Sequence, residues 1–270
     1  MQSPVLTLTL ILGIVIWPAR GNTAPTAQEI ITLARQQLTV PAEFVLGEMK
    51  VYRGEKLNRF YSFVMGKLWE AKTQTESVRL DFKTAVNSSV DSSLYSDQRY
   101  LLKRSPQAPA TQWLYLPALR RVRIIPHQPN DPLLQSDYLF YDLTTIQDFD
   151  DYRYRLIDAN EQAPIIEGEP LDTAGPVPYE KAIFHLEKRG ETYLVTEVQY
   201  SVRGKEKLAR FLAFDEIAPG CYRPQQLVVT GEGGWTEFSF HHWALRAPDP
   251  QLLTPAHLET RTLAFPGTAP

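Results

Sequence analysis

The sequence is poor in the residue types that support disulfide bonding or nucleic-acid binding. Cys221 is the one cysteine among 270 residues, so an intramolecular disulfide is excluded. We expect it to lie buried in a strand, where a free thiol behaves as a small apolar group; a reactive thiol or a link to another chain is the alternative. The sequence has 28 Lys and Arg residues and 31 Asp and Glu residues, so it lacks the excess of basic residues that binding to nucleic acid needs. We therefore expect no nucleic-acid partner.

Catalytic and metal-binding motifs are also absent from the sequence. There is no Gly-x-Ser-x-Gly string, and Cys221 stands in PGCYRP, which is not a cysteine-protease signature. His241 and His242 are adjacent, and neighbouring residues on a strand point to opposite faces, so they cannot easily share one ion. The acidic cluster at 148–151 lacks the glycine and the alternating oxygens of a calcium loop. These absences predict a protein that is not an enzyme and that uses no metal and no cofactor.

Long apolar runs are limited to one, at the N-terminus. Residues 5–17 (VLTLTLILGIVIW) carry no charge, and the run is shorter than the roughly 20 residues of a membrane-spanning helix. Pro18 ends the run, and an Ala-x-Gly string follows at the positions that a signal peptidase reads. We therefore expect residues 1–21 to be a signal peptide, cleaved before Asn22 or nearer Ala27, and the rest to work outside the cytoplasm. An uncleaved N-terminal anchor is the alternative.

Most of the remaining chain has the pattern of short strands. Residues 27–38 have apolar side chains at helical spacing, and Pro41 ends this predicted helix. Beyond it, turn signals recur about every ten residues, as in consecutive antiparallel hairpins. Strands are predicted at 44–52, 58–71, 76–82, 98–103, 112–116, 121–125, 152–157, 181–188, 193–202, 206–214, 222–230 and 236–244.

This pattern predicts an α+β protein that is mostly β, with a single large curved antiparallel sheet. No linker or change of composition divides the strands, so one domain over residues 22–258 is expected. The proline-rich segments 126–134 and 163–178 are predicted to be loops over a rim. Residues 259–270 are predicted to be a disordered tail.

Aromatic and apolar residues gather on the predicted strands. A sheet that curves without closing has an apolar concave face, which helices must cover or a ligand must fill. The sequence does not reveal which face of each strand is concave. The candidate lining residues are Phe60, Phe63, Met65, Trp69, Val78, Leu80, Trp113, Tyr115, Phe214 and Phe238.

A short basic run follows the first group of strands. On a strand at 121–125, Arg121 and Arg123 share one face. They form either an ordinary solvated face or a patch that binds an anionic head group or a partner.

Several strings between residues 95 and 244 carry a family resemblance. WLYLPALRRVRII begins at Trp113, SDYLFYDL follows at Ser136, and DDYRYRL and YLVTEVQY come later. Together they resemble the outer membrane lipoprotein-sorting protein-like family, the branch of the LolA/LolB superfamily often encoded beside export pumps. The family usually has Gly-Ser-Asp-Phe where this chain has Gln135-Ser136-Asp137-Tyr138, so the geometry of that turn stays open.

The resemblance implies an incompletely closed β-barrel with a few helices covering its mouth. It also implies a monomeric periplasmic carrier or chaperone for an acylated or otherwise apolar ligand, such as a lipoprotein or a lipid. A non-enzymatic accessory subunit of a membrane export pump, which binds protein and has no lipid cargo, is the alternative. An enzyme acting on a lipid or a sugar is a third and weaker hypothesis.

Overall fold

The computed structural model describes residues 24–84, 97–105, 108–125, 131–142, 152–172 and 177–267. The predicted signal peptide at 1–21 and the acidic cluster at 148–151 lie outside these residues. No helix in the described ranges is long and apolar enough to cross a membrane.

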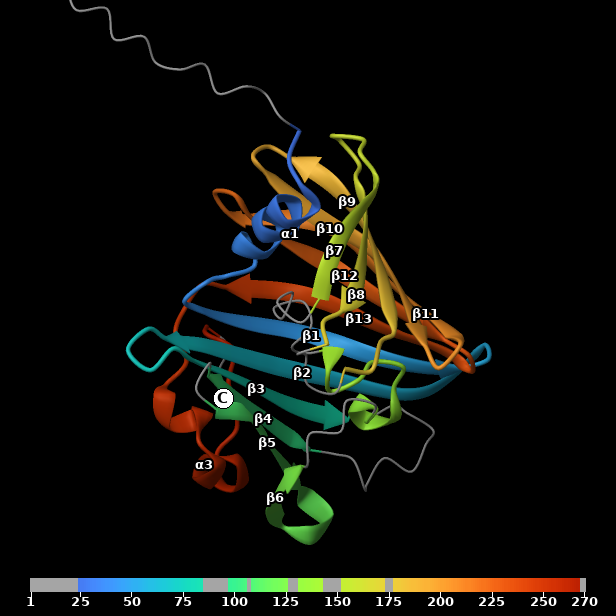
Figure 1. Ribbon diagram of the computed structural model, residues 1–270. Helices are drawn as coiled ribbons and strands as arrows, with labels where there is room; N and C mark the ends of the chain where they lie inside the picture. The colour runs from blue at the N-terminus through green and yellow to red at the C-terminus, as the bar shows by residue number, and fades with distance from the viewer. Residues whose placement is uncertain are drawn as a thin grey trace, which may run out of the picture.

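One antiparallel sheet of thirteen strands forms the body of the protein (Figure 1). The strands are β1 (Ala42–Arg53), β2 (Lys56–Glu70), β3 (Thr75–Thr84), β4 (Arg99–Ser105), β5 (Ala108–Leu116), β6 (Arg121–Ile125), β7 (Tyr152–Asp158), β8 (Ile165–Pro170), β9 (Lys181–Arg189), β10 (Thr192–Val202), β11 (Lys205–Ala218), β12 (Cys221–Gly231) and β13 (Gly234–Ala244). The mostly-β, single-sheet prediction is confirmed.

The order of the strands leaves the sheet open. It runs β6-β5-β4-β3-β2-β1-β13-β12-β11-β10-β9-β8-β7, so β6 and β7 are the two edges and the described strands form no ladder between them. The chain moves outward from β1 to β6, reaches β7 at the far edge, and returns strand by strand to β13 beside β1. The described part of the connection from β6 to β7, residues 131–142, packs on the inner side of the sheet, where its apolar side chains join the main core (Figure 1).

The concave face is built by alternate residues of each strand. On β2, Tyr61 and Phe63 are almost fully buried on the inner face. Phe60 directly precedes Tyr61 in the chain and points to the opposite face. Cross-strand pairing extends the same layer, because Phe63 lies opposite Phe82 of β3 and Met49 lies opposite Phe238 of β13. The main core is thus the inner surface of the bent sheet.

Helix α1 (Ala27–Gln36) covers one end of this inner surface. A capping box starts it, since the Glu29 amide donates to the Thr26 hydroxyl and the Thr26 amide donates to the Glu29 carboxylate. Its buried residues Ile30, Ile31 and Ala34 face the sheet, and the helix contacts β10 and β7. The helix predicted from residue 27 is therefore present.

The C-terminal segment packs on the outer face of β3–β6. It contains the 3-10 helix η4 (Pro250–Leu253) and the helix α3 (Pro255–Thr260), both drawn in red in Figure 1. Leu258 is fully buried there, and Leu263 is buried with its amide donating to Asp81. The prediction of disorder from residue 259 is therefore wrong up to residue 267, because burial of Leu263 and its hydrogen bond fix this segment to β3.

One strand was missed in a predicted loop. The range 163–178 was expected to be a rim loop because of its prolines, yet β8 lies within it. Pro170 ends the strand, and the short run before it pairs with both β7 and β9, so pairing on two sides overrides the turn signals.

Candidate functional site

A cavity of about 180 Å³ lies on the concave face. Its walls come from both halves of the sheet and from the residues after α1. The lining is mostly apolar and aromatic: Gln37, Leu38, Glu43, Phe63, Met65, Lys67, Val78, Leu80, Tyr138, Tyr152, Tyr154, Ala182, Phe184, Val195, Val198, Tyr200, Phe211, Phe214, Arg223, Pro224, Leu227, Phe238, Phe240 and Trp243.

The structure brings six of the ten residues proposed as lining together around this cavity. They are Phe63, Met65, Val78, Leu80, Phe214 and Phe238. Phe63 is central, because its ring lies against Phe82, Phe238 and Phe240 at centroid distances of 5.9, 6.3 and 6.2 Å. Gly47 makes room for it, since a Cβ at residue 47 would stand 2.8 Å from the Phe63 ring.

The other four proposed residues lie elsewhere. Phe60 is on the outer face of β2, with Lys50 Nζ 5.5 Å from its ring centroid. Trp69 sits near the end of β2 and is 37% exposed. Trp113 and Tyr115 belong to the outer layer under η4 and α3, since β5 turns these two positions away from the cavity. None of the four lines the cavity.

Most of the lining that the sequence analysis missed lies on the strands after β6. Tyr154, Phe184, Phe211 and Trp243 stand on β7, β9, β11 and β13, each on the cavity side. The period-two pattern of these strands separated the two faces but did not identify the inner one. The pairing of β1 with β13 joins the half of the sheet that carries these residues to the half that carries Phe63.

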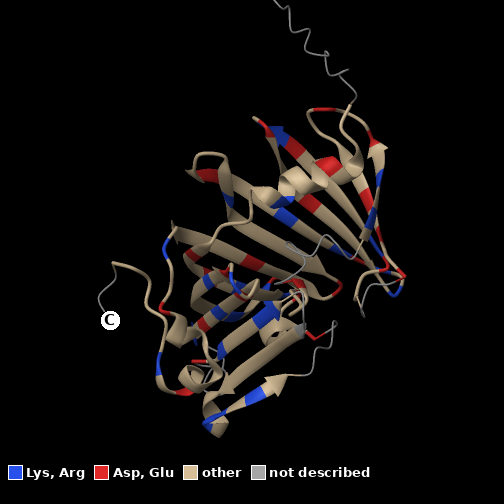
Figure 2. Cartoon of the chain, turned by 60° about the vertical axis from the view of Figure 1, so that its left-hand side comes forward, with Lys and Arg blue, Asp and Glu red and all other residues tan. Residues whose placement is uncertain are grey.

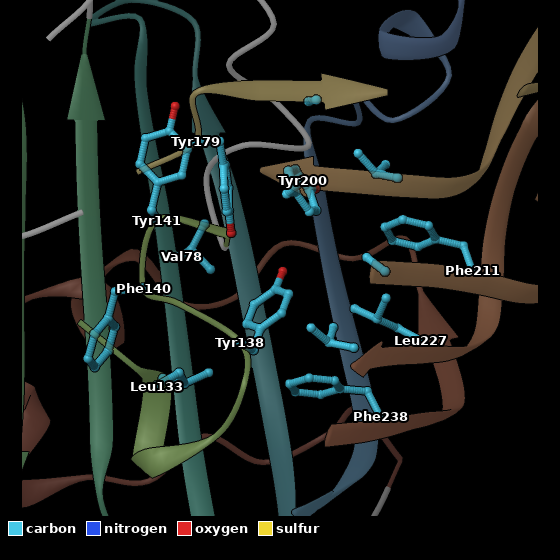
Figure 3. Packing of buried hydrophobic residues seen from close by; sticks show 14 of the residues in the cluster. Val78, Leu133, Tyr138, Phe140, Tyr141, Tyr179, Tyr200, Phe211, Leu227 and Phe238 are labelled. Carbon is cyan, nitrogen blue, oxygen red and sulfur yellow. The ribbon is translucent and has the colours of Figure 1, made fainter. Parts of the chain in front are cut away.

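The segment 131–142 covers part of the cavity. Its η2 turn (Leu133–Gln135) and the residues that follow bury Leu133, Tyr138 and Phe140 against the sheet. Figure 3 shows Tyr138 of this segment beside Phe238 of β13, and their ring centroids are 5.1 Å apart. This segment is thus a lid on the open side, and we call 131–142 the covering segment.

A buried polar cluster ties the covering segment to the far half of the sheet. Lys207 of β11 donates to the Asp142 carboxylate and, at 2.6 Å, to the Tyr179 hydroxyl. Tyr179 also donates to Asp142, and its ring is stacked on Tyr200 with centroids 4.1 Å apart (Figure 3). The Tyr138 hydroxyl donates to the Asp142 carbonyl at 2.8 Å. Burial, and secondarily the Asp142 charge, raises the pKa of Tyr138, Tyr179 and Tyr200 well above the usual value.

A second set of contacts holds the middle of the covering segment. Asp137 accepts from Arg53 at 2.7 Å and from the Thr236 hydroxyl at 3.0 Å. Arg53 also donates to the Gln135 carbonyl at 2.7 Å. Gln135, at the position where the resembling family has glycine, adopts a φ of +61°, and its side chain accepts from Arg59 at 2.5 Å. The turn therefore keeps a glycine-like conformation without glycine.

One end of the cavity is polar and carries a row of alternating charges. Arg223 pairs with Glu43 at 3.1 Å, Lys67 lies 3.5 Å from both Glu43 and Glu76, and Arg104 pairs with Glu76 at 2.7 Å. All but Arg104 are buried, with side chains no more than 6% exposed. Strands β12, β1, β2, β3 and β4 each supply one member.

Arg223 also connects this polar row to the end of α1. Its guanidinium donates to the carbonyls of Gln37 at 3.1 Å and Leu38 at 3.2 Å, and stands 5.7 Å from the Trp243 ring centroid. Cys221 lies beside it, buried as predicted, with its thiol 3.5 Å from the Gln37 carbonyl. Burial raises the pKa of this thiol.

Arg121 and Arg123 are remote from the cavity lining. They are exposed on β6, the edge strand at the opposite end of the order from β7. Their role as a head-group or partner patch remains a proposal.

The inner wall presents mainly carbon atoms to the cavity. In the described ranges, no group of three or more His, Cys, Asp or Glu side chains could hold a metal ion. Val78, Phe211, Leu227 and Phe238 present only carbon to the inner space, as Figure 3 illustrates.

Comparisons with known proteins agree on the fold. A family model described as "-like: Uncharacterized protein" matches residues 91–260. A domain from Vibrio parahaemolyticus, described as an outer membrane lipoprotein-sorting protein, is 18% identical with a TM-score of 0.69 and covers 86% of this chain and 99% of its own. A DUF1329 protein from Desulfovibrio piger is 20% identical with a TM-score of 0.71, again over 86% and 99%.

A LolA superfamily protein from Nitrosomonas europaea is 16% identical with a TM-score of 0.60, over 86% of this chain and 98% of that one. No curated protein sequence matches the chain. The family model spans more than half of the residues, so the chain belongs to the family that this model describes. The three structures share its fold, which is the fold that the resemblance to the outer membrane lipoprotein-sorting protein-like family implies.

Proposed function

We propose that this protein is a non-enzymatic periplasmic carrier or chaperone that binds an acylated or otherwise apolar ligand, such as a lipoprotein or a lipid. The observation that carries the proposal is the cavity between the concave sheet and the covering segment, whose walls are mainly aromatic and aliphatic. The description of the Vibrio relative as lipoprotein-sorting agrees with this class of ligand.

Binding by such a cavity would rest on burial of hydrocarbon. Each methylene that leaves water contributes about 0.8 kcal/mol, so one acyl chain supplies most of the affinity of a carrier. The cavity of about 180 Å³ is little larger than an engineered cavity of about 150 Å³ that binds benzene. A complete acyl chain therefore requires the covering segment or α1 to move outward.

The contacts of the covering segment set the cost of such a movement. Asp142, at its C-terminal end, pairs with Lys207, and Asp137, in its middle, pairs with Arg53. Opening breaks these contacts and withdraws Leu133, Tyr138 and Phe140 from the sheet, so burial of the ligand must offset that loss. Opening would expose the inner aromatic face to a donor or an acceptor.

The test is to identify the molecules that are bound to the protein when it is isolated from the periplasm. The full-length chain would be purified from periplasm without detergent, and examined by native mass spectrometry and by extraction of its lipids. A carrier yields a bound mass that denaturation releases as an acylated molecule. A protein that is ligand-free in every preparation, and that takes up no acyl probe, would favour the accessory-subunit alternative.

A further inference from the structure

The charged lining of the cavity has one cation more than it has carboxylates. Of the row, Arg223, Lys67 and Glu43 line the cavity, whereas Glu76 and Arg104 lie behind the lining. The four buried members, Arg223, Lys67, Glu43 and Glu76, balance one another in charge.

Lys67 is the member of the row with the weakest pairing. Its ammonium lies 3.5 Å from one oxygen of Glu43 and 3.5 Å from one oxygen of Glu76, which is longer than a good charge-assisted hydrogen bond. Arg223, by contrast, is saturated by Glu43 and by the carbonyls of Gln37 and Leu38. The ammonium of Lys67 can therefore donate hydrogen bonds to a further, anionic group in the cavity.

Beyond these charges the cavity continues as hydrocarbon. Met65 is next on the inner face of β2 after Lys67, and Phe63 follows. An occupant that satisfies both regions has an anionic group at the α1 end and an apolar chain that runs along β2 toward Phe238.

We propose that the cavity selects an anionic amphiphile, an acyl or alkyl chain that ends in a carboxylate or a phosphate, with its charged end on Lys67. This inference rests on the proposed carrier function and deepens it, because it names the chemical class of the ligand. Glu43 stands at the same end and opposes an anion, so recognition comes from the two cations of the lining, Arg223 and Lys67, and above all from the weakly engaged donors of Lys67.

The experiment compares matched probes on the full-length protein by isothermal titration calorimetry. Dodecanoate, dodecyl phosphate and the uncharged methyl ester of dodecanoate share one chain length. We expect each anion to bind at least about tenfold more tightly than the ester, which corresponds to about 1.4 kcal/mol. The ratio of the affinities for dodecanoate and dodecyl phosphate shows whether the site prefers a carboxylate or a phosphate.

Two variants alter the row by one charge in opposite directions. Lys67→Gln leaves Arg223 and Glu43 as the charged lining, which together are neutral, and should remove the preference for the anions. Glu76→Gln, at a residue that does not line the cavity, raises the charge by one and should strengthen that preference. If Lys67→Gln does not fold, the probe comparison on the unaltered protein and on Glu76→Gln still decides.

Equal affinity for the ester and the anions would overturn the anionic selectivity and leave the carrier function standing. Binding of none of the three probes would count against both.

A second inference comes independently from the distribution of charge along the chain. Residues 98–130 contain six basic and no acidic residues, although the whole chain has a net charge of −3. This stretch forms β4, β5 and β6, the strands at one edge of the sheet. Figure 2 shows charges of both signs interspersed over the strands elsewhere in the molecule.

The tip of this edge combines basic and apolar side chains. Arg120, Arg121 and Arg123 are exposed, and no acidic residue in the described ranges lies within ion-pair distance of them. Leu119 and Ile124 beside them are 52% and 68% exposed. Exposed apolar groups flanked by arginine match a surface of anionic lipid, where each cation contributes about 1 kcal/mol of attraction. We infer that this edge docks the protein on an anionic membrane surface.

Vesicle flotation tests this docking edge. The protein should float with vesicles of phosphatidylcholine and phosphatidylglycerol, release at high salt, and not float with phosphatidylcholine alone. Arg121→Ser/Arg123→Ser should abolish flotation. Arg153→Ser/Arg155→Ser is the matched control, because it removes two exposed arginines at the same spacing from the other edge strand, β7, where Glu167 pairs with Arg155.

Flotation that ignores lipid charge, or that survives loss of Arg121 and Arg123, would overturn the docking inference. Absence of flotation with both kinds of vesicle would also overturn it, and a protein partner would then be the candidate for this edge.

Discussion

The Lys207 ammonium and the Asp142 carboxylate form a buried ion pair between strand β11 and the covering segment. Because Asp142 belongs to the covering segment and Lys207 to strand β11, this pair joins the cover to the sheet that forms the wall of the cavity. Removal of one partner from a buried pair leaves an uncompensated charge and costs about 3–5 kcal/mol.

We therefore predict that Lys207→Met lowers the free energy of unfolding by about 3–5 kcal/mol, and that adding Asp142→Asn recovers part of the loss. Urea unfolding of the two single variants and the double variant measures this coupling. Additive losses would show that the two side chains do not stabilise one another.

The turn at Gln135 gives a prediction about backbone strain. With φ at +61°, a residue with a Cβ is strained there by about 1 kcal/mol, and glycine is not. Gln135→Gly and Gln135→Ala both lose the hydrogen bond from Arg59. We expect the glycine variant to be the more stable of the two by about 1 kcal/mol in thermal unfolding. Equal stabilities would mean that the turn relaxes without cost.

Cys221 should be inert in the native protein. Burial raises the pKa of its thiol, which lowers the fraction of reactive thiolate at neutral pH. We expect slow labelling by a thiol reagent until denaturant unfolds the chain, and then rapid labelling of one thiol per chain. Rapid labelling of the folded protein would contradict the buried position beside Gln37.

The tyrosines around Lys207 predict loss of stability at alkaline pH. Tyr138, Tyr179 and Tyr200 have a higher pKa in the folded than in the unfolded state. Above the unfolded value of about 10, the unfolded chain loses these protons while the folded chain retains them, so stability declines as the pH rises. The stability that these tyrosines contribute is fully present below a pH of about 10.

Ultraviolet titration of the phenolates, followed together with circular dichroism, checks this behaviour. The signal from the buried tyrosines should appear only as the fold is lost. Their ionisation in an intact fold would show that the cluster is open to solvent.

The sequence was sufficient for twelve of the thirteen strands and for the fold class, but not for β8 or for the inner face. Alternation along β2 separates Phe63 from Phe60, and Trp113 of β5 has the same kind of pattern, yet only Phe63 lines the cavity. Which face is concave depends on the bend of the whole sheet and on the side that the covering segment and the C-terminal helices occupy. These are long-range properties that no local period encodes.

The charged row was invisible to sequence reasoning for a similar reason. Glu43 and Arg223 are 180 residues apart, and they meet because β1 pairs with β13 and β12 lies next to it. Each charge taken alone resembles an ordinary solvated residue, and only the register of the strands reveals the row.

A matched pair on one strand tests the carrier function most directly. Phe63 faces the cavity and Phe60 faces outward on the same strand β2. Val195 of β10 also lines the cavity, and Val195→Trp would fill it without introducing charge. Urea unfolding of each variant first establishes that it is folded.

The measurement is the affinity of the full-length protein for a fluorescent acyl probe. We predict that Phe63→Glu and Val195→Trp each weaken binding at least about tenfold, about 1.4 kcal/mol, and that Phe60→Glu leaves it unchanged. Unchanged binding in both folded cavity variants, or an equal loss in Phe60→Glu, would contradict the proposal that this cavity carries the ligand.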